Sequence, residues 1–456
     1  MPGLNTSMNI AVQALLAEQG ALNVTTNNIA NVNTPGYSRE MAVLQEAPTV
    51  IDGGNNYGMG VTLQEFQSVR DQMLQLRLYE ENGQQGNAQA QLNSLNQIQS
   101  YFADPTKGVG GALTAFFNSL SQLSTNPTDT STRQQVLLAA NNLANAFHAS
   151  ADALQNLQSS LDEAVPQTVT QINSLTTQIA ALNAQVAEMQ GLGHDPGTTQ
   201  DRRDQLVLQL SQLVNVSVTQ TDHGINITTA NGVPLVVSGK SFDLQSGTAS
   251  GGLQGVYSQG QDITSQLQGG QLGGTLQVRD TVVPDMLGQL DTLASQLATT
   301  FNTAHQAGFD LNGNPGGNFF TPLAAVAGAA TSFSVAISDP ALVAASSDGS
   351  AGSNGNVVQL LAIKDQKLPV GFTPVGAYAN FVLTVGNYGS NAQANLTAST
   401  ASLQQLTDQR NAVSGVSIDE ESTNMIQFQR AYEAAARVIT TVNSMMQTLI
   451  NIGVTG

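Results

Sequence analysis

Several residue types are rare or absent in this chain of 456 residues. It has no cysteine and no tryptophan, and charged residues make up 10% of it, against roughly 25% in an ordinary soluble domain. Without cysteine, neither a disulfide nor a thiolate metal site can form. No run of about 18 consecutive apolar residues occurs, so no membrane-spanning helix is predicted. The first residues lack the basic start and compact apolar run of a secretory signal, so we expect any export to proceed without a cleaved signal peptide.

Basic residues are scarce as well, and the formal net charge is −18. Such a surface repels phosphate backbones and anionic lipids, which argues against nucleic-acid and membrane partners. No glycine-rich loop precedes a helix in a phosphate-binding pattern, and no nucleophile–base set can be recognised. The histidines are scattered and not placed at metal-ligand spacing: His148, His194, His223 and His305. The sequence therefore predicts no catalytic, cofactor-binding or metal-ligating residue, no cofactor, and a protein that is not an enzyme.

Apolar residues recur every seven positions near both ends of the chain, and this spacing predicts a seam against another helix. The N-terminal line is Met8, Leu15, Leu22 and Ile29. Glu18 is the only charged residue before Arg39. The C-terminal lines are Ile418, Met425, Tyr432, Ile439 and Met446, and beside them Phe428, Ala435, Val442 and Leu449. We interpret the two ends as packing together, or against copies of themselves, which favours assembly over catalysis.

Helical patterns dominate the first half of the chain. A helix is expected over residues 5–29, extended or irregular chain over 37–63, and a second helix over 64–101. The longest helical signal spans 128–190, and Pro166 should kink or split it. A short helix follows, carrying Leu206, Leu210 and Leu213.

The apolar period then changes to two. Alternating residues over 216–237, with turns at Asp222-His223-Gly224 and Asn231-Gly232, predict an antiparallel meander. Glycine-rich sequence over 247–274 is expected to extend this β region. A helix is predicted over 281–306 and a strand over 333–337. A last helical region should run from about 375 to 450, interrupted only at Ser414-Gly415.

Together these patterns predict a mainly α fold with inserted β structure. We expect a long helical bundle or rod, with the N- and C-terminal helices paired as a coiled coil and a β-rich module looped out from the middle. The predicted domains are a terminal coiled coil (1–36 with 416–456), a helical bundle (37–214 with 281–307 and 375–415), a β-rich module (215–280) and a small mixed outer region (308–374).

Two motifs at opposite ends resemble one known group of proteins. Residues 27–39 read Asn-Asn-Ile-Ala-Asn-Val-Asn-Thr-Pro-Gly-Tyr-Ser-Arg. Residues 414–421 read Ser-Gly-Val-Ser-Ile-Asp-Glu-Glu, and residues 426–439 read Ile-Gln-Phe-Gln-Arg-Ala-Tyr-Glu-Ala-Ala-Ala-Arg-Val-Ile. Both are similar to the terminal signatures of bacterial flagellar axial proteins. The Pro-Gly-Tyr-Ser-Arg form, the Asp-Glu-Glu form and the long central helices look most like hook-associated protein 1, the FlgK family. The signature turn comprises Asn31, Asn33, Pro35, Gly36 and Tyr37.

This resemblance implies a structural protein that joins hook and filament. Its terminal helices would pair into the inner tube of the axis, and its partners would be like subunits in a ring, hook protein and a second junction protein on the filament side. It would leave the cell through the flagellar type III export apparatus with an export chaperone, and act outside the cell at the hook–filament junction. The terminal segments are expected to be disordered in the free monomer, because so short and weakly hydrophobic a segment does not repay its ordering entropy alone.

Two departures from the family pattern and two alternatives stand beside this reading. Glu40 replaces the usual glutamine after the arginine, and the chain is short, which suggests a reduced outer domain. The alternatives are a hook or rod protein of the same axial group, or an exported enzyme or adhesin with activity in the central region.

Two charged segments are expected to be solvated. Residues 201–204, Asp-Arg-Arg-Asp, are interpreted as a self-paired helix start, with a contact to a neighbouring subunit as the alternative. Residues 419–421 should complement a helix dipole, with Glu421 at a solvated end of the tube.

Overall fold

A computed structural model of the chain describes residues 2–52, 55–102, 108–221 and 224–454. The chain forms two compact units, each with segments distant in sequence. Unit 1 comprises Met1–Gly83, Gln171–Leu244 and Ser399–Gly456, and unit 2 comprises Gln84–Thr170 and Gln245–Ala398. The structure is mainly helical with small antiparallel sheets from the middle of the sequence, which confirms the predicted fold class.

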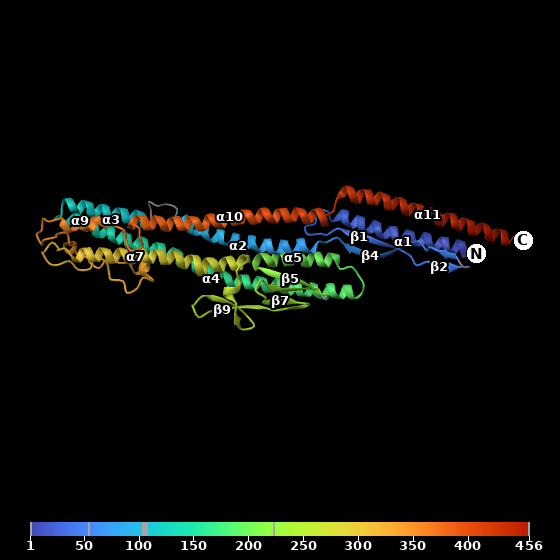
Figure 1. Cartoon of the computed structure of the whole chain (residues 1–456), viewed down its shortest axis with the longest axis horizontal. Coiled ribbons are helices and arrows are strands. Elements are labelled where there is room, and N and C mark those ends of the chain that lie inside the picture. The colour runs from blue at the N-terminus through green and yellow to red at the C-terminus, as the bar shows by residue number, and fades with distance from the viewer. Residues whose placement is uncertain (1, 53–54, 103–107, 222–223, 455–456) are drawn as a thin grey trace. The chain divides into compact units, whose positions relative to one another are not determined.

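The two terminal helices of unit 1 pack along each other (Figure 1). They are α1 (Pro2–Ala30) and α11 (Ile418–Val454). The other side of α1 contacts an antiparallel ribbon of β1 (Glu40–Glu46) and β4 (Val61–Ser68), which β2 (Val50–Asp52) and β3 (Asn55–Tyr57) extend. Gly20 permits this close approach, because a Cβ atom there would lie 2.8 Å from Leu63 Cδ2. The extended chain predicted over 37–63 therefore folds as a ribbon against α1.

The rest of unit 1 surrounds a four-stranded meander. The predicted antiparallel meander is present: the strands β5 (Val216–Thr221), β6 (Gly224–Thr229), β7 (Pro234–Val237) and β8 (Lys240–Ser241) pair in sequence order. Asp222 and His223, in the first predicted turn, lie outside the described residues. Helix α5 (Gly197–Leu213) precedes the sheet. Asn183 of the long helix α4 (Thr130–Gly191) donates to the Ile225 and Ser238 carbonyls.

Two helical predictions need correction. Helix α2 (Gln72–Phe102) begins later than residue 64, because residues 61–68 pair with β1 instead. Helix α4 (Thr130–Gly191) is one helix of 62 residues that contains Pro166, so no split occurs. Val165 and Val169 beside the proline are buried, and their packing offsets the loss of one backbone hydrogen bond.

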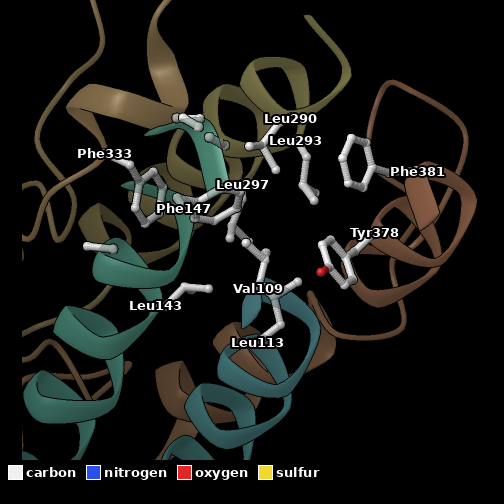
Figure 2. Packing of buried hydrophobic residues seen from close by; sticks show 14 of the residues in the cluster. Val109, Leu113, Leu143, Phe147, Leu290, Leu293, Leu297, Phe333, Tyr378 and Phe381 are labelled. Atoms are coloured by element: carbon white, nitrogen blue, oxygen red, sulfur yellow. The ribbon is translucent and has the colours of Figure 1, made fainter. Parts of the chain in front are cut away.

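Unit 2 is a helical assembly around one apolar core. Its helices include α3 (Gly108–Thr125), α6 (Gly270–Gln277), α7 (Val283–Gln306), α9 (Gly355–Ala362) and most of α10 (Pro374–Ser414), with a π-helical segment, η2 (Val278–Val282), before α7. Figure 2 shows side chains from α3, α4, α7 and α10 converging in this core: Val109, Leu113, Leu143, Phe147, Leu290, Leu293, Leu297, Tyr378 and Phe381, together with Phe333.

The β structure of unit 2 is smaller than predicted. The strands β9 (Leu244–Thr248), β10 (Gln254–Ser258) and β11 (Gln261–Asp262) form one sheet, and the 3₁₀ turn η1 (Thr264–Gln266) follows. Residues 270–277 are helix α6 and not β. Residues 333–337 form no strand; Val335 makes only an isolated bridge to Phe320. The helix α8 (Ala329–Ser332) and the 3₁₀ turn η3 (Pro340–Leu342) are the helical elements of that region.

The β5–β8 sheet and the β9–β11 sheet belong to different units, since the chain passes from unit 1 to unit 2 after Leu244. The four domains predicted from the sequence do not nest within these units, because residues 37–214 and residues 215–280 each contain parts of both, and they stay a prediction. Among the described residues, no helix combines the length and the apolar character needed to cross a membrane.

Candidate functional site: the joint of the two chain ends

The predicted seam of α11 faces α1 along most of its length. Ala435 and Val442 are buried. Ile418, the first residue of one line, and Leu449, the last residue of the other, are exposed. The remaining seam residues are half-buried: Met425, Phe428, Tyr432, Ile439 and Met446. The structure thus brings the middle of the seam together and leaves its ends in solvent.

On α1, the deepest contacts come from residues that the seven-residue pattern missed. The predicted line, Met8, Leu15, Leu22 and Ile29, is half-buried. The fully buried apolar residues are Ala11, Ala17, Ala21 and Val24. Helix α1 contacts both α11 and the ribbon, so its buried face is wider than one seam. The steps of four, three and four from Ala17 through Ala21 and Val24 to Asn28 are the signal that could have located this face.

Asn28 closes the joint at the end of α1. Its side chain is fully buried, and its Nδ2 donates to Glu40 O at 2.8 Å and to Glu421 Oε2 at 3.1 Å. Its Oδ1 accepts from Tyr37 Oη at 2.9 Å and from the backbone N–H of Glu40 at 3.0 Å. An asparagine amide has two donors and room for two accepted bonds, so one side chain uses its full capacity to tie three segments together.

The signature turn wraps back against α1 and leaves two of its residues in solvent. Asn31 Nδ2 donates to Asn27 O at 3.0 Å. Gly36 has a φ of +80°, in the left-handed region that favours glycine, and a Cβ there would lie 2.5 Å from the Gln205 amide. Tyr37 is buried, whereas Asn33 and Pro35 are exposed.

Arg39 links the N-terminal signature to the C-terminal one. Its backbone N–H donates to Ser414 O at 2.8 Å, and its Nη1 lies 2.6 Å from Glu420 Oε2. Its Nε lies 3.9 Å from Glu421 Oε1. Glu421 is buried, so the expectation of a solvated end was wrong: Asn28 and Arg39 supply the partners that make burial of its carboxylate tolerable.

A second charged cluster holds Ser38. The Ser38 N–H and Oγ donate to the Asp201 carboxylate at 2.9 and 2.7 Å. Arg70 donates to Asp201 Oδ1 at 2.7 Å, to Asp204 Oδ2 at 2.9 Å and to Gly197 O at 2.6 Å. Asp201 and Arg203 are buried, so residues 201–204 are not a solvated helix start, whereas the expected pairing within the segment is present between Arg203 Nη2 and Asp204 Oδ1 at 3.0 Å. Arg70, distant in sequence, pairs with both aspartates.

The carbonyls of the signature turn are also held from α10 and α5. Arg410 Nη2 donates to Gly36 O at 2.6 Å and to Tyr37 O at 3.2 Å. The Gln205 side chain donates to Pro35 O. Three helices of unit 1, α1, α5 and α10, therefore bond to this turn. A cleft of about 740 Å³ lies beside it, lined by the turn, α2, α5, β5, β6 and the end of α10.

Burial sets the electrostatics of the joint. It raises the pKa of Tyr37, and the nearby carboxylates of Glu40, Asp201 and Glu421 raise it further. Burial raises the pKa of Asp201, although Arg70 and Ser38 oppose this shift. Burial, with the charge of Asp195, also raises the pKa of Glu40. Among the described residues, no group of three metal-binding side chains occurs. The arrangement is suited to holding segments in place.

Both ends and the middle of the chain match known family models. Residues 8–37 match the flagella basal body rod protein model, and residues 409–452 match the C-terminal model of flagellar basal body rod FlgEFG proteins. Residues 95–320 match the helical domain of flagellar hook-associated protein FlgK. The two terminal matches define the class of the protein, an axial protein of the bacterial flagellum.

Similar proteins narrow this class. Flagellar hook-associated protein 1 of Bacillus subtilis is 30% identical over 97% of this chain and 97% of its own. That of Escherichia coli K12 is 28% identical over 98% of this chain and 100% of its own. The flagellar hook junction protein FlgK from Burkholderia pseudomallei shares the fold, with a TM-score of 0.67 at 20% identity over 74% of this chain and 100% of that one.

The chain belongs to the flagellar hook-associated protein 1 (FlgK) family. It is a structural component of the flagellar axis at the junction of hook and filament. The alignment with the Escherichia coli relative runs over 546 positions, so that relative carries segments that this chain lacks.

Proposed function

We propose that this chain assembles into a ring through the α1–α11 pair and thereby joins the hook to the filament. The observation that carries the proposal is the pairing itself, in which the described part of α1 contributes one charged residue, Glu18. A helix that packs on neighbours around its circumference avoids the cost of burying unpaired charge.

Apolar side chains left exposed on the pair support this role. Val12 and Leu16 of α1, and Ile426, Val438 and Met445 of α11, are each more than one-third exposed. Exposed apolar residues gathered on one element mark contact surfaces. In the ring, neighbouring copies would cover them.

The remaining parts of the proposal follow from family membership. The ring would contact hook protein on one side and a second junction protein on the other. The chain would be exported, with a chaperone, through the flagellar type III apparatus without a cleaved signal peptide, and would act outside the cell. We propose a structural role alone, with no enzymatic activity and no cofactor.

Substitutions on one helix test the assembly role. Val442→Asp, combined with Met425→Asp, puts charge into the α1–α11 contact, whereas Gln447→Asp puts charge on an exposed position of the same helix. We expect the double variant to abolish swimming in soft agar and the control to swim normally. Motile cells after deletion of residues 420–456 would refute the proposal.

Position in the flagellum separates the junction role from that of a hook or rod protein. A labelled chain should mark one short zone at the hook tip in electron micrographs of isolated flagella. Label along the whole hook, or within the rod, would favour the alternative.

A further inference from the structure

Residues 308–346 of unit 2, here called the outer segment, cover the aromatic core with little regular structure of their own. The segment contains α8, η3 and isolated bridges. Phe319, Phe320 and Phe333 from it are fully buried, and Phe319 and Phe320 pack against Phe116 and Phe301. Its detachment would therefore expose a large apolar surface.

Backbone N–H and C=O groups of this segment form hydrogen bonds with side chains of the helices. In a sheet, a neighbouring strand would supply these bonds. Asn302 accepts from Phe319 N and Phe320 N and donates to Phe320 O. The Asp291 carboxylate accepts from Gly328 N and Ala330 N, each at 2.8 Å. Further bonds run from Arg133 to Val343 O, from Asn356 to Ala344 O, and between His148 Nε2 and Phe333 O.

His305 is the member of this set whose protonation state the geometry fixes. It is fully buried at the end of α7. Its Nδ1 lies 2.8 Å from Gly317 O, so this nitrogen must carry a proton. Its Nε2 accepts from the backbone N–H of Ala344 at 2.9 Å, so this nitrogen must carry none. Only the neutral ring makes both bonds.

A second proton on the His305 ring would place an N–H donor at Nε2, facing the Ala344 N–H donor. An imidazolium has N–H groups at both nitrogens, and the new one would point at the Ala344 N–H. The buried Ala344 donor would then lose its partner, and the cation would lie in an apolar pocket between Phe301 and Phe319.

The charged groups around the ring do not offset this cost. Helices α3 and α9 carry no charged residue, and Asp285 and Asp291 of α7 lie about four or more turns before His305. The charged side chains bonded to the outer segment, or next to it, engage other partners: Arg133, Asp310, Asp339 and Asp348.

We propose that His305 makes the outer segment an acid-sensitive clasp, which opens more often from the helices in mildly acidic solution while the helices stay folded. The bond that breaks is Ala344 N–H to Nε2, and the proton comes from solvent when the segment opens. The clasp is independent of the assembly role proposed above, because it lies in unit 2.

The direction of the effect follows from linkage. Burial lowers the pKa of His305 below its ordinary value of 6.5, so the opened segment binds a proton more readily than the closed one. The closed state is favoured above pH 6.5 and loses stability as the pH falls below it. The opening equilibrium rises about fivefold over the first pH unit below 6.5 and approaches tenfold per unit below that, until the closed state also protonates.

Amide hydrogen exchange of the full chain at pH 7.5, 6.5 and 5.5 tests the proposal. After correction for the intrinsic change of exchange rate with pH, peptides from the outer segment should lose about fivefold protection between pH 6.5 and 5.5, and about tenfold between pH 7.5 and 5.5. Peptides from α3 should keep theirs. Equal protection of the outer segment at pH 7.5 and 5.5 would overturn the proposal.

Two variants and one direct titration assign the effect. His305→Gln keeps one donor and one acceptor without a titrating ring and should remove the pH dependence. His148→Gln should leave it unchanged, because the single bond of His148 to Phe333 O survives protonation of the other ring nitrogen. If His305→Gln does not fold, histidine NMR of the unaltered protein decides: a His305 ring that titrates near 6.5 with the outer segment still protected contradicts the clasp.

Discussion

At the scale of single residues, the joint depends on polar side chains that hydrophobic patterns do not reveal. Asn28 sits on the buried face of α1 among alanines and a valine, and its amide is saturated with hydrogen bonds. Glu421 and Asp201 are buried carboxylates whose partners lie far away in the sequence. Such sites depend on long-range contacts, which explains why both carboxylates were expected in solvent.

Asn28→Ala should loosen the joint strongly. The change removes four hydrogen bonds and leaves the buried Glu421 carboxylate and Tyr37 hydroxyl short of a partner, a cost of about 3 kcal/mol. In isolated flagella, where neighbours hold the terminal helices, we expect amides of residues 31–40 to exchange roughly 100-fold faster. Asn33→Ala, at an exposed position of the same turn, is the control and should change little. Equal exchange in the two variants would contradict the role given to Asn28.

Glu40→Gln should stabilise unit 1 near neutral pH. Burial and Asp195 raise the pKa of Glu40 above its ordinary 4.5, so the fold favours the protonated form and carries a penalty once the pH rises above that range. A neutral glutamine avoids this penalty and still accepts from Asn27. The unfolding midpoint should rise at pH 7, and the gain should shrink as the medium becomes acidic. Glu46→Gln, exposed on the same strand, should show no such trend.

At the scale of elements, periodicity predicted the helices well and irregular segments poorly. The paired terminal helices, the meander and the break at Ser414-Gly415 are all present. The outer segment was misread because its alternation over 333–337 matches a strand, whereas helix side chains supply its hydrogen bonds. Sequence periodicity reports which side faces the core, and it does not report which group satisfies the backbone.

Two helical glycines in unit 2 should respond in opposite directions to alanine. A Cβ at Gly274 of α6 would lie 2.5 Å from Asn87 O of α2, whereas a Cβ at Gly288 of α7 meets nothing within 4 Å. Gly274→Ala should destabilise unit 2, because a backbone atom must shift. Gly288→Ala should stabilise it by up to about 1 kcal/mol through helix propensity. Urea denaturation followed by circular dichroism measures both, and a shared sign would refute the packing argument.

At the scale of the whole molecule, the function was predicted from the family resemblance and not from the periodicity. Seven-residue lines indicate that helices seek partners, but the motifs at residues 27–39 and 414–439 specified the flagellar axis. The pairing of the two ends was predicted, but the contacts of Arg39 and Asn28 that join the two motifs were not, since no local pattern couples residues almost 400 positions apart.

The free chain should show low protection in α1 and α11 and high protection in α3. The terminal pair is long and thin and exposes apolar residues on both helices, so neighbours must contribute to its stability. Hydrogen exchange of the dilute monomer should report near-unprotected terminal amides, with at least 100-fold slower exchange once the chain is in isolated flagella. Full protection in the dilute monomer would contradict this expectation.

The hydrogen bonds of the Asn28 amide require both ends of the chain. The amide bonds to Glu40, close in the sequence, and to Glu421, which lies 393 positions away in α11. The last turn of α1 therefore has all its hydrogen-bond partners only when α11 is present. In an assembled ring, a chain cut short before residue 421 would leave Asn28 with a buried donor unpaired. A truncated subunit should therefore fit a growing structure less well than an intact one.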